Sequence, residues 1–204
     1  MLLQADAIAV ERGEDLILQG LSFDLSAGEM LVLEGENGSG KSTLLRAIAG
    51  LLPLSAGTLM LSNKGEFEEQ NLSDLCHYLG HDNAMKTNLA LGENLDFWRN
   101  MAFEPHLETE EALEMVGLVG LESIPFAHLS TGQRRRAAIA RLLVSYRPIW
   151  LLDEPTAGLD AQSSEQFAAL LGAHLEDHGL VIAATHVPLG VPNTKHLRLG
   201  VPSS

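Results

Sequence analysis

The stretch GENGSGKST occupies residues 35–43, directly after the apolar run MLVLE and directly before a helical pattern. Gly35, Gly40, Lys41 and Ser42 have the spacing of a phosphate-binding loop. Glycines let the backbone N–H groups wrap around a phosphate, the lysine reaches the β- and γ-phosphate oxygens, and the serine hydroxyl can bind Mg²⁺. A chance match in a glycine-rich chain is disfavoured because a strand pattern precedes the loop and a helix pattern follows it.

Hydrophobic patterns on both sides of this loop have the lengths of strands and helices. Strand-length apolar stretches at residues 2–10, 20–25, 30–34 and 57–61 predict a β-rich beginning of the chain. A helical pattern starts at Lys41 and ends near Gly50. The apolar runs in IWLLDEP and LVIAATH enclose a further helical pattern at residues 161–175. This alternation predicts a mostly parallel sheet covered by helices, which is an α/β core.

The β pattern disappears between about residues 82 and 127, where helical patterns at residues 93–101 and 108–116 replace it. We interpret this region as an inserted α-helical subdomain. The flanking residues 1–81 and 128–204 would form the nucleotide-binding core of a single domain, for which 204 residues are sufficient. The acidic segment at residues 64–75 is expected to be an exposed connection.

Composition restricts the function. With 13 basic and 27 acidic side chains the formal net charge is -14, which argues against a nucleic-acid partner because such a surface needs a basic face. The basic cluster Arg134, Arg135, Arg136 and Arg141 is interpreted as a solvated helix face. Cys76 is the only cysteine, which fits a reducing compartment. No leader pattern or membrane-spanning run occurs, so any membrane contact is expected to pass through partner proteins.

The segment IWLLDEPTAGLD supplies the second half of a nucleotide site. Asp153 and Glu154 follow four apolar residues, at the expected end of a strand. Asp153 is placed to hold Mg²⁺, and Glu154 to accept a proton from an attacking water, which contributes about 10²- to 10⁴-fold in rate. Alone, the pair could be an acidic turn after a buried strand. A kinase would also fit both motifs, but it leaves the later LSTGQ segment without a role.

LSTGQ, at residues 129–133, opens a long helical pattern with small polar residues and a glycine. Free N–H groups at a helix N-terminus attract anions, so this is a second candidate phosphate site. It is redundant in a monomer, but not in a head-to-tail homodimer that forms in the ATP state. There, one chain's loop closes over the γ-phosphate held by Lys41 of the other, and hydrolysis releases the pair. The loop residues concerned are Ser130, Thr131, Gly132 and Gln133.

GENGSGKST, LSTGQ, LLDEP, AGLD and ATH, in this order and spacing, resemble the ATP-binding subunits of ABC transporters over nearly the whole chain. The resemblance implies a P-loop ATPase core with an N-terminal antiparallel β part, ATP and Mg²⁺ as ligands, and membrane permeases as partners. It makes LSTGQ the signature motif, Asp160 a dimer contact, and His186 the switch histidine that contacts the γ-phosphate. The expected phosphate contacts are Gly35, Glu36, Asn37, Gly38, Ser39, Gly40, Lys41, Ser42 and Thr43.

The chain departs from the family pattern at three positions. Where the family has a glutamine that contacts Mg²⁺ or water, this chain has His81 followed by Asp82, so the coupling position is altered and His81 is the candidate metal contact. Where the family stacks adenine on an aromatic ring, the candidate here is Arg12, whose planar guanidinium could stack on the base. Thr131 replaces the common second glycine of the signature.

Two stretches, YLGHDNAMKTNLALGENLDFW and AATHVPLG, look like the ATP-binding subunits of haem exporters in cytochrome c maturation. This resemblance implies a place on the cytoplasmic face of a bacterial inner membrane, beside integral permease subunits of that system. The ATP cycle would drive release of a haem-loaded periplasmic chaperone. A permease segment is expected to dock on an apolar row comprising Met85, Leu89, Leu91 and Leu95.

Haem binding by the chain itself is not expected. The sequence has no C-x-x-C-H, and the histidines are interpreted as surface residues, with His174 and His178 on one helix face.

Three other functions fit part of the pattern. The chain could serve another small ABC exporter. A soluble ABC-type ATPase acting on ribosomes or DNA normally carries two fused ATPase units, a long insertion or basic arms, and this sequence has none of these. A regulatory nucleotide-binding module without turnover would not need the complete set of Lys41, Asp153, Glu154 and His186.

Overall fold

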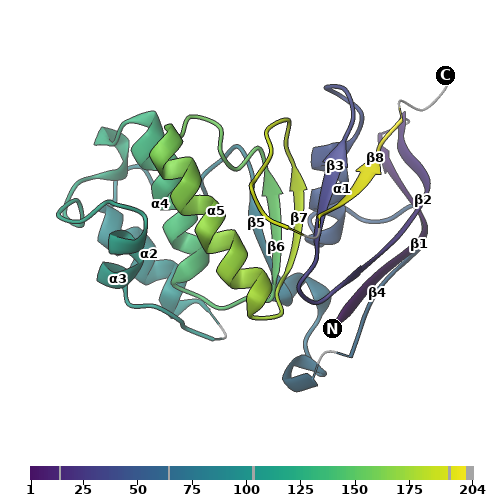
Figure 1. The fold of residues 1–204 in the computed structure, drawn as a ribbon, viewed down its shortest axis with the longest axis horizontal. Helices are drawn as coiled ribbons and strands as arrows, with labels where there is room; N and C mark the ends of the chain where they lie inside the picture. The colour runs from purple at the N-terminus through teal and green to yellow at the C-terminus, as the bar shows by residue number, and fades with distance from the viewer. Residues whose placement is uncertain (14, 64, 103, 193, 201–204) are drawn as a thin grey trace.

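The computed structural model describes residues 1–13, 15–63, 65–102, 104–192 and 194–200, so Lys64 of the acidic segment lies outside the described residues. The strands in these ranges are β1 (Leu2–Arg12), β2 (Asp15–Ser26), β3 (Met30–Glu34), β4 (Ala56–Ser62), β5 (Cys76–Leu79), β6 (Ile149–Asp153), β7 (Leu180–Ala184) and β8 (Thr194–Arg198). The helices are α1 (Lys41–Ile48), α2 (Leu91–Asn100), α3 (Thr109–Met115), α4 (Thr131–Leu143) and α5 (Ala161–Glu176). Short 3₁₀ turns occur at Gly65–Phe67, Leu72–Leu75 and Phe126–His128. The elements form layers: α2, α3, α4 and α5 lie on one side of a central sheet, and α1 and a second sheet lie on the other (Figure 1).

The central sheet has the strand order β5-β6-β7-β3-β8, and the registered pairs are all parallel. Every residue of β6 and β7 is buried, as expected for strands that are covered on both faces. The prediction of a mostly parallel sheet in an α/β core is therefore confirmed. Because the strands are parallel, their carboxyl ends meet at one edge of the sheet, where open α/β folds bind ligands.

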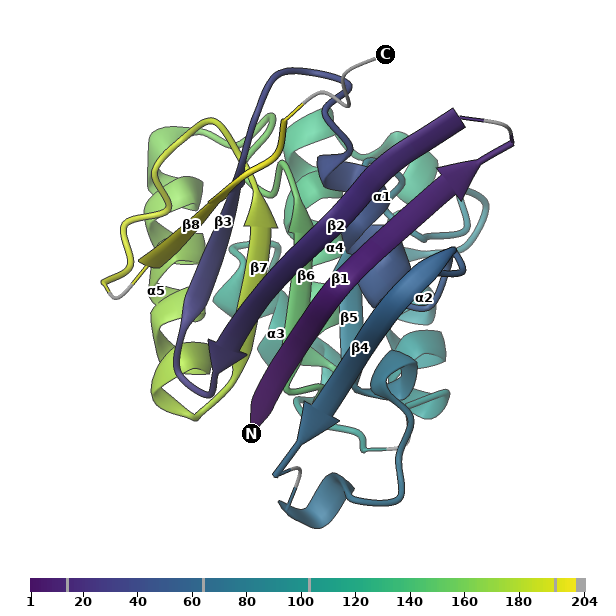
Figure 2. The ribbon, with the colours of Figure 1, turned by 90° about the vertical axis from the view of Figure 1, so that its right-hand side faces the viewer.

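The second sheet has the order β2-β1-β4 and is antiparallel, as the family resemblance implied. Figure 2 shows its three strands lying across α1 and the central sheet. Leu3, Ile8 and Leu25 of this sheet share a buried cluster with Leu44 and Leu45 of α1. Burial of such side chains contributes about 1.5–3 kcal/mol each, so the β sheet fixes the helix that follows the phosphate loop.

On the other face, α4 and α5 pack against the central sheet, and α2 and α3 lie further out (Figure 1). A second buried cluster joins these helices to the sheet; it includes Leu91 and Leu95 of α2, Leu113 of α3 and Phe167 of α5. The helices predicted at residues 93–101 and 108–116 are present as α2 and α3. The division into a core and a subdomain at residues 82 and 127 stays a prediction.

The acidic segment is not simply an exposed connection. Phe67 and Leu75 are buried in the cluster that contains α1, and the Phe67 ring stacks on Tyr146 with centroids 6.1 Å apart. The acidic residues Glu68, Glu69 and Asp74 remain exposed. Two apolar side chains that the acidic composition concealed therefore anchor the segment.

The interpretation of the arginine cluster as a solvated face is wrong for two of its members. Arg135 and Arg141 of α4 are only 6% and 5% exposed. Their guanidinium groups donate to the edge strand: Arg135 Nη1 to Gly80 O at 2.8 Å and Arg141 Nη2 to Tyr78 O at 2.7 Å. Arg147 Nη1 continues the series by donating to Cys76 O at 2.7 Å. The carbonyls of Cys76 and Tyr78 in β5 and of Gly80 directly after it thus bind guanidinium groups. These bonds compensate much of the burial of the two α4 arginines, although Arg141 Nε has no partner in the described part of the chain.

The histidines are not all at the surface. His77 and His174 are buried, and the His174 ring stacks on Trp150 with centroids 4.1 Å apart. Burial lowers the pKa of both rings, that of His174 to about 4, so both are neutral at pH 7. His178 lies beyond the end of α5 at a φ of 62°, and therefore does not share a helix face with His174. The exposed histidines are His81, His106, His128, His178, His186 and His196.

Candidate nucleotide and catalytic site

The loop at residues 35–43 joins β3 to the N-terminus of α1. Lys41 folds back over it, with Nζ donating to Gly35 O at 2.7 Å and to Glu36 O at 3.0 Å. Gly35 and Gly40 have φ angles of 147° and 95°, which favour glycine. A Cβ at Gly35 would lie 2.5 Å from Ser39 Oγ, and one at Gly40 would lie 2.7 Å from Leu18 Cδ2. The loop thus keeps its shape only with glycine at both positions.

Two features of the loop fit a phosphate group. The Ser39 hydroxyl oxygen is buried and has no hydrogen-bond partner in the described part of the chain, and an unpaired buried hydroxyl costs about 1–3 kcal/mol. Gly40, the N-cap of α1, supplies no side-chain cap. The first N–H groups of α1 therefore remain available to an anion, at the positive end of the helix dipole. Ser42 lies in the same turn and is half-buried.

Asp153 ends β6 and is 3% exposed. The Tyr78 hydroxyl, from the neighbouring strand β5, donates to Asp153 Oδ2 at 3.4 Å and accepts from Arg46 Nε of α1 at 3.3 Å. Burial raises the pKa of Tyr78, while its bond to Arg46 opposes that shift, so the hydroxyl keeps its proton for Asp153. Tyr78 is therefore a functional candidate that the sequence patterns missed, because an aromatic residue in a strand reads as core.

Glu154 and His186 are brought together by neighbouring strands. His186 Nε2 lies 3.7 Å from Glu154 Oε1, and the two side chains are 57% and 27% exposed respectively. Glu154 has a φ of 46°, an uncommon value for a residue with a side chain. Its N–H donates to Ala184 O at 2.8 Å, which ties the turn after β6 to the end of β7. Both predicted catalytic side chains thus lie at the ligand-binding edge of the sheet.

Arg135 is the second functional candidate that the sequence patterns missed. It donates to Asp153 O, Glu154 O and Pro155 O, at 2.9, 2.6 and 2.8 Å, in addition to Gly80 O. A signal was present, since Arg135 occurs at helical spacing with the buried Ala138 and Leu142. A charged residue on the core face of a helix needs an internal partner, and a turn of backbone carbonyls is one.

The signature loop begins α4. Gln133 N donates to Ser130 Oγ at 3.2 Å and Ser130 N donates to Gln133 Oε1 at 2.8 Å, which is a reciprocal capping box. Ser130 and Thr131 are exposed. A Cβ at Gly132 would lie 3.1 Å from Gly158 O, so glycine lets the loop pack closely on the segment before α5. Asp160 caps α5 by accepting from Ser163 N at 2.7 Å, and this bond lowers the pKa of Asp160.

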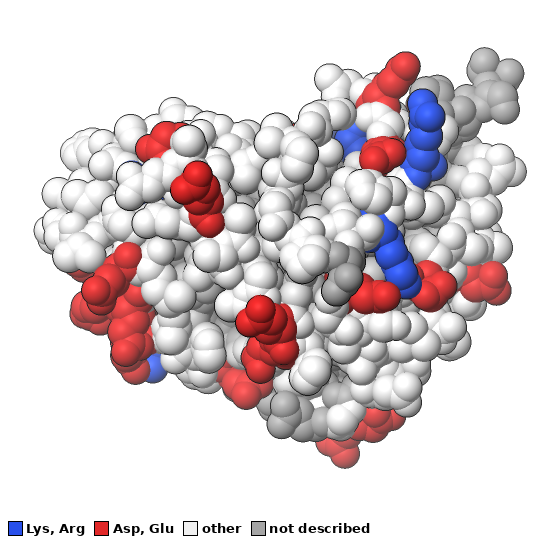
Figure 3. All heavy atoms as spheres, viewed as in Figure 1, with Lys and Arg blue, Asp and Glu red and all other residues white. Residues whose placement is uncertain are grey.

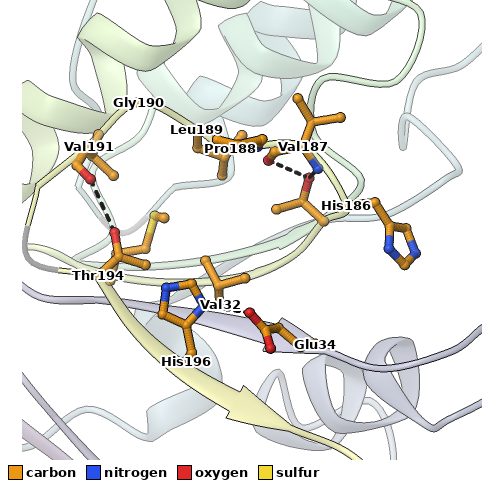
Figure 4. A pocket seen from close by; sticks show the side chains of 12 residues that line it. Val32, Glu34, His186, Val187, Pro188, Leu189, Gly190, Val191, Thr194 and His196 are labelled. Carbon is orange, nitrogen blue, oxygen red and sulfur yellow. Dashed lines mark hydrogen bonds and ion pairs between the residues drawn. The ribbon is translucent and has the colours of Figure 1, made fainter.

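A cavity of about 420 Å³ opens beside His186, between β3 and the connection that leads from β7 to β8. Figure 4 shows His186 at one end of it, and the pair formed by Glu34 and His196 nearer to β8. His196 Nδ1 lies 2.7 Å from Glu34 Oε1. The space exists because this connection is short and contains no helix in the described residues, whereas parallel crossovers usually do.

Two predicted contacts, Arg12 and His81, are placed less closely. Arg12, at the exposed end of β1, is paired in register with Asp15 of β2. Leu18, three residues further along β2, contacts the phosphate loop, so about 10 Å of strand separates Arg12 from it. His81 is exposed, and among the described residues no hydrogen bond or ion pair joins it to Asp153. No cluster of three or more His, Cys, Asp or Glu that could hold a metal occurs in the described ranges.

The apolar row expected to dock a permease segment is wrong for Leu91 and Leu95, which are fully buried because they hold α2 to the other helices. Met85 packs against the same cluster, and Leu89 is half-buried. Helix α2 instead exposes Phe97, to 42%. Met101, directly after the end of this helix, is exposed to 67%. Within the described residues, no helix is both long and apolar enough to span a membrane.

The parallel sheet, the glycine loop that opens α1 and the acidic pair at the end of β6 define a nucleotide-binding protein of the P-loop class. The profile of the family described as ABC transporter matches residues 18–157. Cytochrome c biogenesis ATP-binding export proteins CcmA from Mesorhizobium japonicum and Chelativorans sp. are each 54% identical to the chain, covering 98% of it and 99% and 98% of themselves. The CcmA protein of Brucella abortus is 50% identical over 94% of the chain and 88% of that protein. The chain belongs to the ABC transporter family, and within it to the group of cytochrome c biogenesis ATP-binding export proteins CcmA.

Solved structures agree in fold. An ATP-binding ABC transporter protein from Pyrococcus furiosus superimposes with a TM-score of 0.82 at 20% identity, covering 98% of both chains. The ATP-binding cassette MJ0796, solved as a dimer in a post-hydrolysis state with ADP and Pi, gives a TM-score of 0.76 at 25% identity. That match covers 91% of this chain and 88% of the other. The fold is therefore that of an ABC ATPase, as predicted.

Proposed function

We propose that this chain binds ATP with Mg²⁺ and hydrolyses it as the motor subunit of a membrane exporter that serves cytochrome c maturation by moving haem. The observation that carries the hydrolytic part is the approach of Glu154 and His186, 3.7 Å apart at the carboxyl edge of the parallel sheet. The CcmA relatives, about half identical along nearly their whole length, support the assignment to this exporter. ATP hydrolysis follows from membership of this family.

The phosphate loop holds the nucleotide in this proposal. Backbone N–H groups of residues 35–43 face the phosphates, and Lys41 exchanges its bonds to the loop carbonyls for the β- and γ-phosphate oxygens. Ser42 and Asp153 would hold Mg²⁺, which commonly binds one or two protein oxygens together with substrate phosphates and waters. Arg12 would stack on the base, and His81 takes the position next to the metal that the family gives to glutamine. When bound, the ion neutralises charge on the phosphates.

Hydrolysis uses the two side chains at the strand ends. The Glu154 carboxylate accepts a proton from the water that attacks the γ-phosphorus, while the bond from that phosphorus to the β–γ bridging oxygen breaks. ADP and inorganic phosphate are the products. His186 donates a hydrogen bond to a γ-phosphate oxygen, as its exposed ring beside Glu154 allows. Asp153, through the bonds of its neighbours Tyr78 and Arg135, is fixed before nucleotide arrives.

Two chains would assemble head to tail around two nucleotides. Ser130 and Thr131 are exposed at the start of α4, with their backbone N–H groups at the positive end of a helix dipole. This surface can meet the γ-phosphate bound to Lys41 of a second chain. Asp160, exposed beside the signature loop, would contact the partner chain at the same interface. Loss of the γ-phosphate then weakens the interface, which converts hydrolysis into separation of the chains.

Integral permease subunits would receive this movement at the cytoplasmic face of a bacterial inner membrane. On the face of the molecule in Figure 3 acidic side chains are more widespread than basic ones, and the net charge is -14, which disfavours nucleic acid and bare anionic lipid as partners. Membrane contact is therefore assigned to protein subunits. The movement would drive release of a haem-loaded periplasmic chaperone.

The test replaces the chain in its bacterium by Glu154→Gln and measures covalent haem in c-type cytochromes. Haem staining should be lost although the variant accumulates normally and still co-purifies with integral membrane subunits. Glu165→Gln, at an exposed glutamate of α5, is the matched control and should keep haem attachment. Normal haem attachment with Glu154→Gln, or co-purification with ribosomes instead of membrane subunits, would contradict the proposed function.

A further inference from the structure

The described hydrogen bonds of the Arg135 guanidinium all go to backbone carbonyl oxygens. Nε donates to Pro155 O at 2.8 Å, Nη1 to Gly80 O at 2.8 Å, and Nη2 to both Asp153 O and Glu154 O at 2.9 and 2.6 Å. No carboxylate oxygen is among these partners. Four hydrogen bonds from one rigid, planar guanidinium group fix the path of the backbone around it, and they do not neutralise a charged side chain.

The shape it specifies includes the backbone of Glu154. A φ of 46° places this residue in the left-handed region, where a residue other than glycine costs on the order of 1–3 kcal/mol. Such a conformation persists only when its surroundings impose it. Here the Glu154 N–H is bound to Ala184 O at 2.8 Å and the Glu154 carbonyl to Arg135 at 2.6 Å. These two bonds direct the side chain that faces His186.

Arg135 also connects segments that are far apart in sequence. It lies near the start of α4, shortly after the exposed Ser130 and Thr131, and one of its nitrogens reaches Gly80, directly before His81. A helix is stiff over this distance. Displacement of the start of α4 therefore acts on the Glu154 turn and on the end of β5 together.

We propose that Arg135 is a positioning residue for hydrolysis, which holds the Glu154 backbone and links the signature helix to the Gly80–His81 turn. The proposal rests on the proposed role of Glu154 as the general base. Arg135 does not touch the nucleotide in this role, so its loss should lower turnover without weakening nucleotide binding.

The test compares Arg135→Lys with Arg141→Lys. Both arginines are buried in α4 and donate to carbonyls in β5 or directly after it, but among the described contacts only Arg135 reaches Glu154. A lysine ammonium cannot reproduce the four-carbonyl fork. For Arg135→Lys we expect kcat to fall by about 10- to 100-fold with the KM for ATP changed by less than about twofold. Arg141→Lys should lose a similar amount of thermal stability and keep kcat within about twofold.

A double-mutant cycle shows whether Arg135 acts through Glu154. In the Glu154→Gln background, Arg135→Lys should lower the residual kcat by less than about twofold, because the group it positions is already absent. Parental kcat in folded Arg135→Lys would overturn the proposal. So would equal losses of kcat in the two lysine variants, or fully additive losses in the cycle. Parental turnover by Glu154→Gln would instead remove the base itself, a failure seen without any change at Arg135.

Discussion

Nε2 of His186 lies 3.7 Å from Oε1 of Glu154, although the two residues follow different strands. Asp153 of β6 is in register with Ala184 of β7, so the residues that follow both strands leave the sheet side by side. Glu154 is 27% exposed and His186 57%, which makes the pair accessible to a ligand on the sheet edge. Each side chain can therefore be replaced with limited effect on the core.

Glu154→Gln should bind ATP but hydrolyse it about 10²- to 10⁴-fold more slowly, because the amide cannot accept the proton of the attacking water. ATP should then hold the chains together as a stable dimer. Phosphate release and size-exclusion chromatography with ATP measure the two effects. Glu165→Gln is the control, and turnover by Glu154→Gln equal to that of the control would exclude a general base at this position.

Gly40→Ala should lose both stability and nucleotide affinity. At a φ of 95° an added Cβ would lie 2.7 Å from Leu18 Cδ2, so backbone strain and overpacking add to a total of about 2–6 kcal/mol. Gly120→Ala is the matched control, because its φ of 81° carries similar strain but nothing lies within 4 Å of the added atom. Chemical denaturation and a fluorescent ATP analogue measure the two properties. Equal losses of stability in the two variants would show that the contact with Leu18 is unimportant.

Mixing Lys41→Ala with Ser130→Arg should restore activity that neither variant has alone. If Ser130 acts on the nucleotide of the partner chain, a mixed dimer has one site with both lesions and one intact site. With half of the dimers mixed and the sites independent, recovery reaches about a quarter of the parental rate. ATP-dependent formation of the mixed dimer is followed in parallel, since strict coupling between the sites would hide the recovered turnover. Folded variants that give neither turnover nor a mixed dimer would refute action across the interface.

Acid should destabilise the protein through His174. Its pKa is lowered by burial from 6.5 to about 4, so the unfolded chain binds a proton that the folded chain excludes. The stability that depends on the neutral ring is complete above pH 6.5 and is lost as the pH falls toward 4. His174→Phe, which keeps an aromatic ring on Trp150, should reduce the slope of unfolding free energy in this window by up to about 1.4 kcal/mol per pH unit. Denaturant titrations at several pH values measure this slope, and the exposed His128→Gln is the control. An unchanged slope in His174→Phe would mean that His174 does not take up a proton on unfolding.

Local sequence signals predicted well the order of strands and helices around the phosphate loop. Alternating and continuous apolar runs located β3, α1, β6, α5 and β7, because each of these elements shows its burial in its own hydrophobic pattern. The same runs concealed Phe67, whose burial depends on Tyr146 far along the chain. Elements were thus predictable where local pattern and tertiary packing agree.

The site was predictable in its motifs and not in its supports. Glycine and acidic motifs predicted Lys41 and Glu154, whose roles stay predictions, whereas Arg135 and Tyr78 contact partners that only the folded chain brings near. The arginine cluster was predicted to be solvated because the partners of its buried members are backbone carbonyls. Every residue has a backbone carbonyl, so the sequence does not indicate which ones an arginine will contact. The prediction of a docking row around Leu91 was wrong for a related reason: the buried face of a helix and an exposed docking surface have the same local apolar pattern.

Charged side chains lie at both edge strands of the central sheet. At β5 the free carbonyls bind the guanidinium groups of Arg135, Arg141 and Arg147, and at β8 the exposed side is charged, with Lys195 bound to Glu29 and Asp24. A strand from another molecule would therefore meet carbonyls already bound to guanidinium groups at β5, and charged side chains at β8. These side chains therefore disfavour self-association of the protein through the edges of its central sheet.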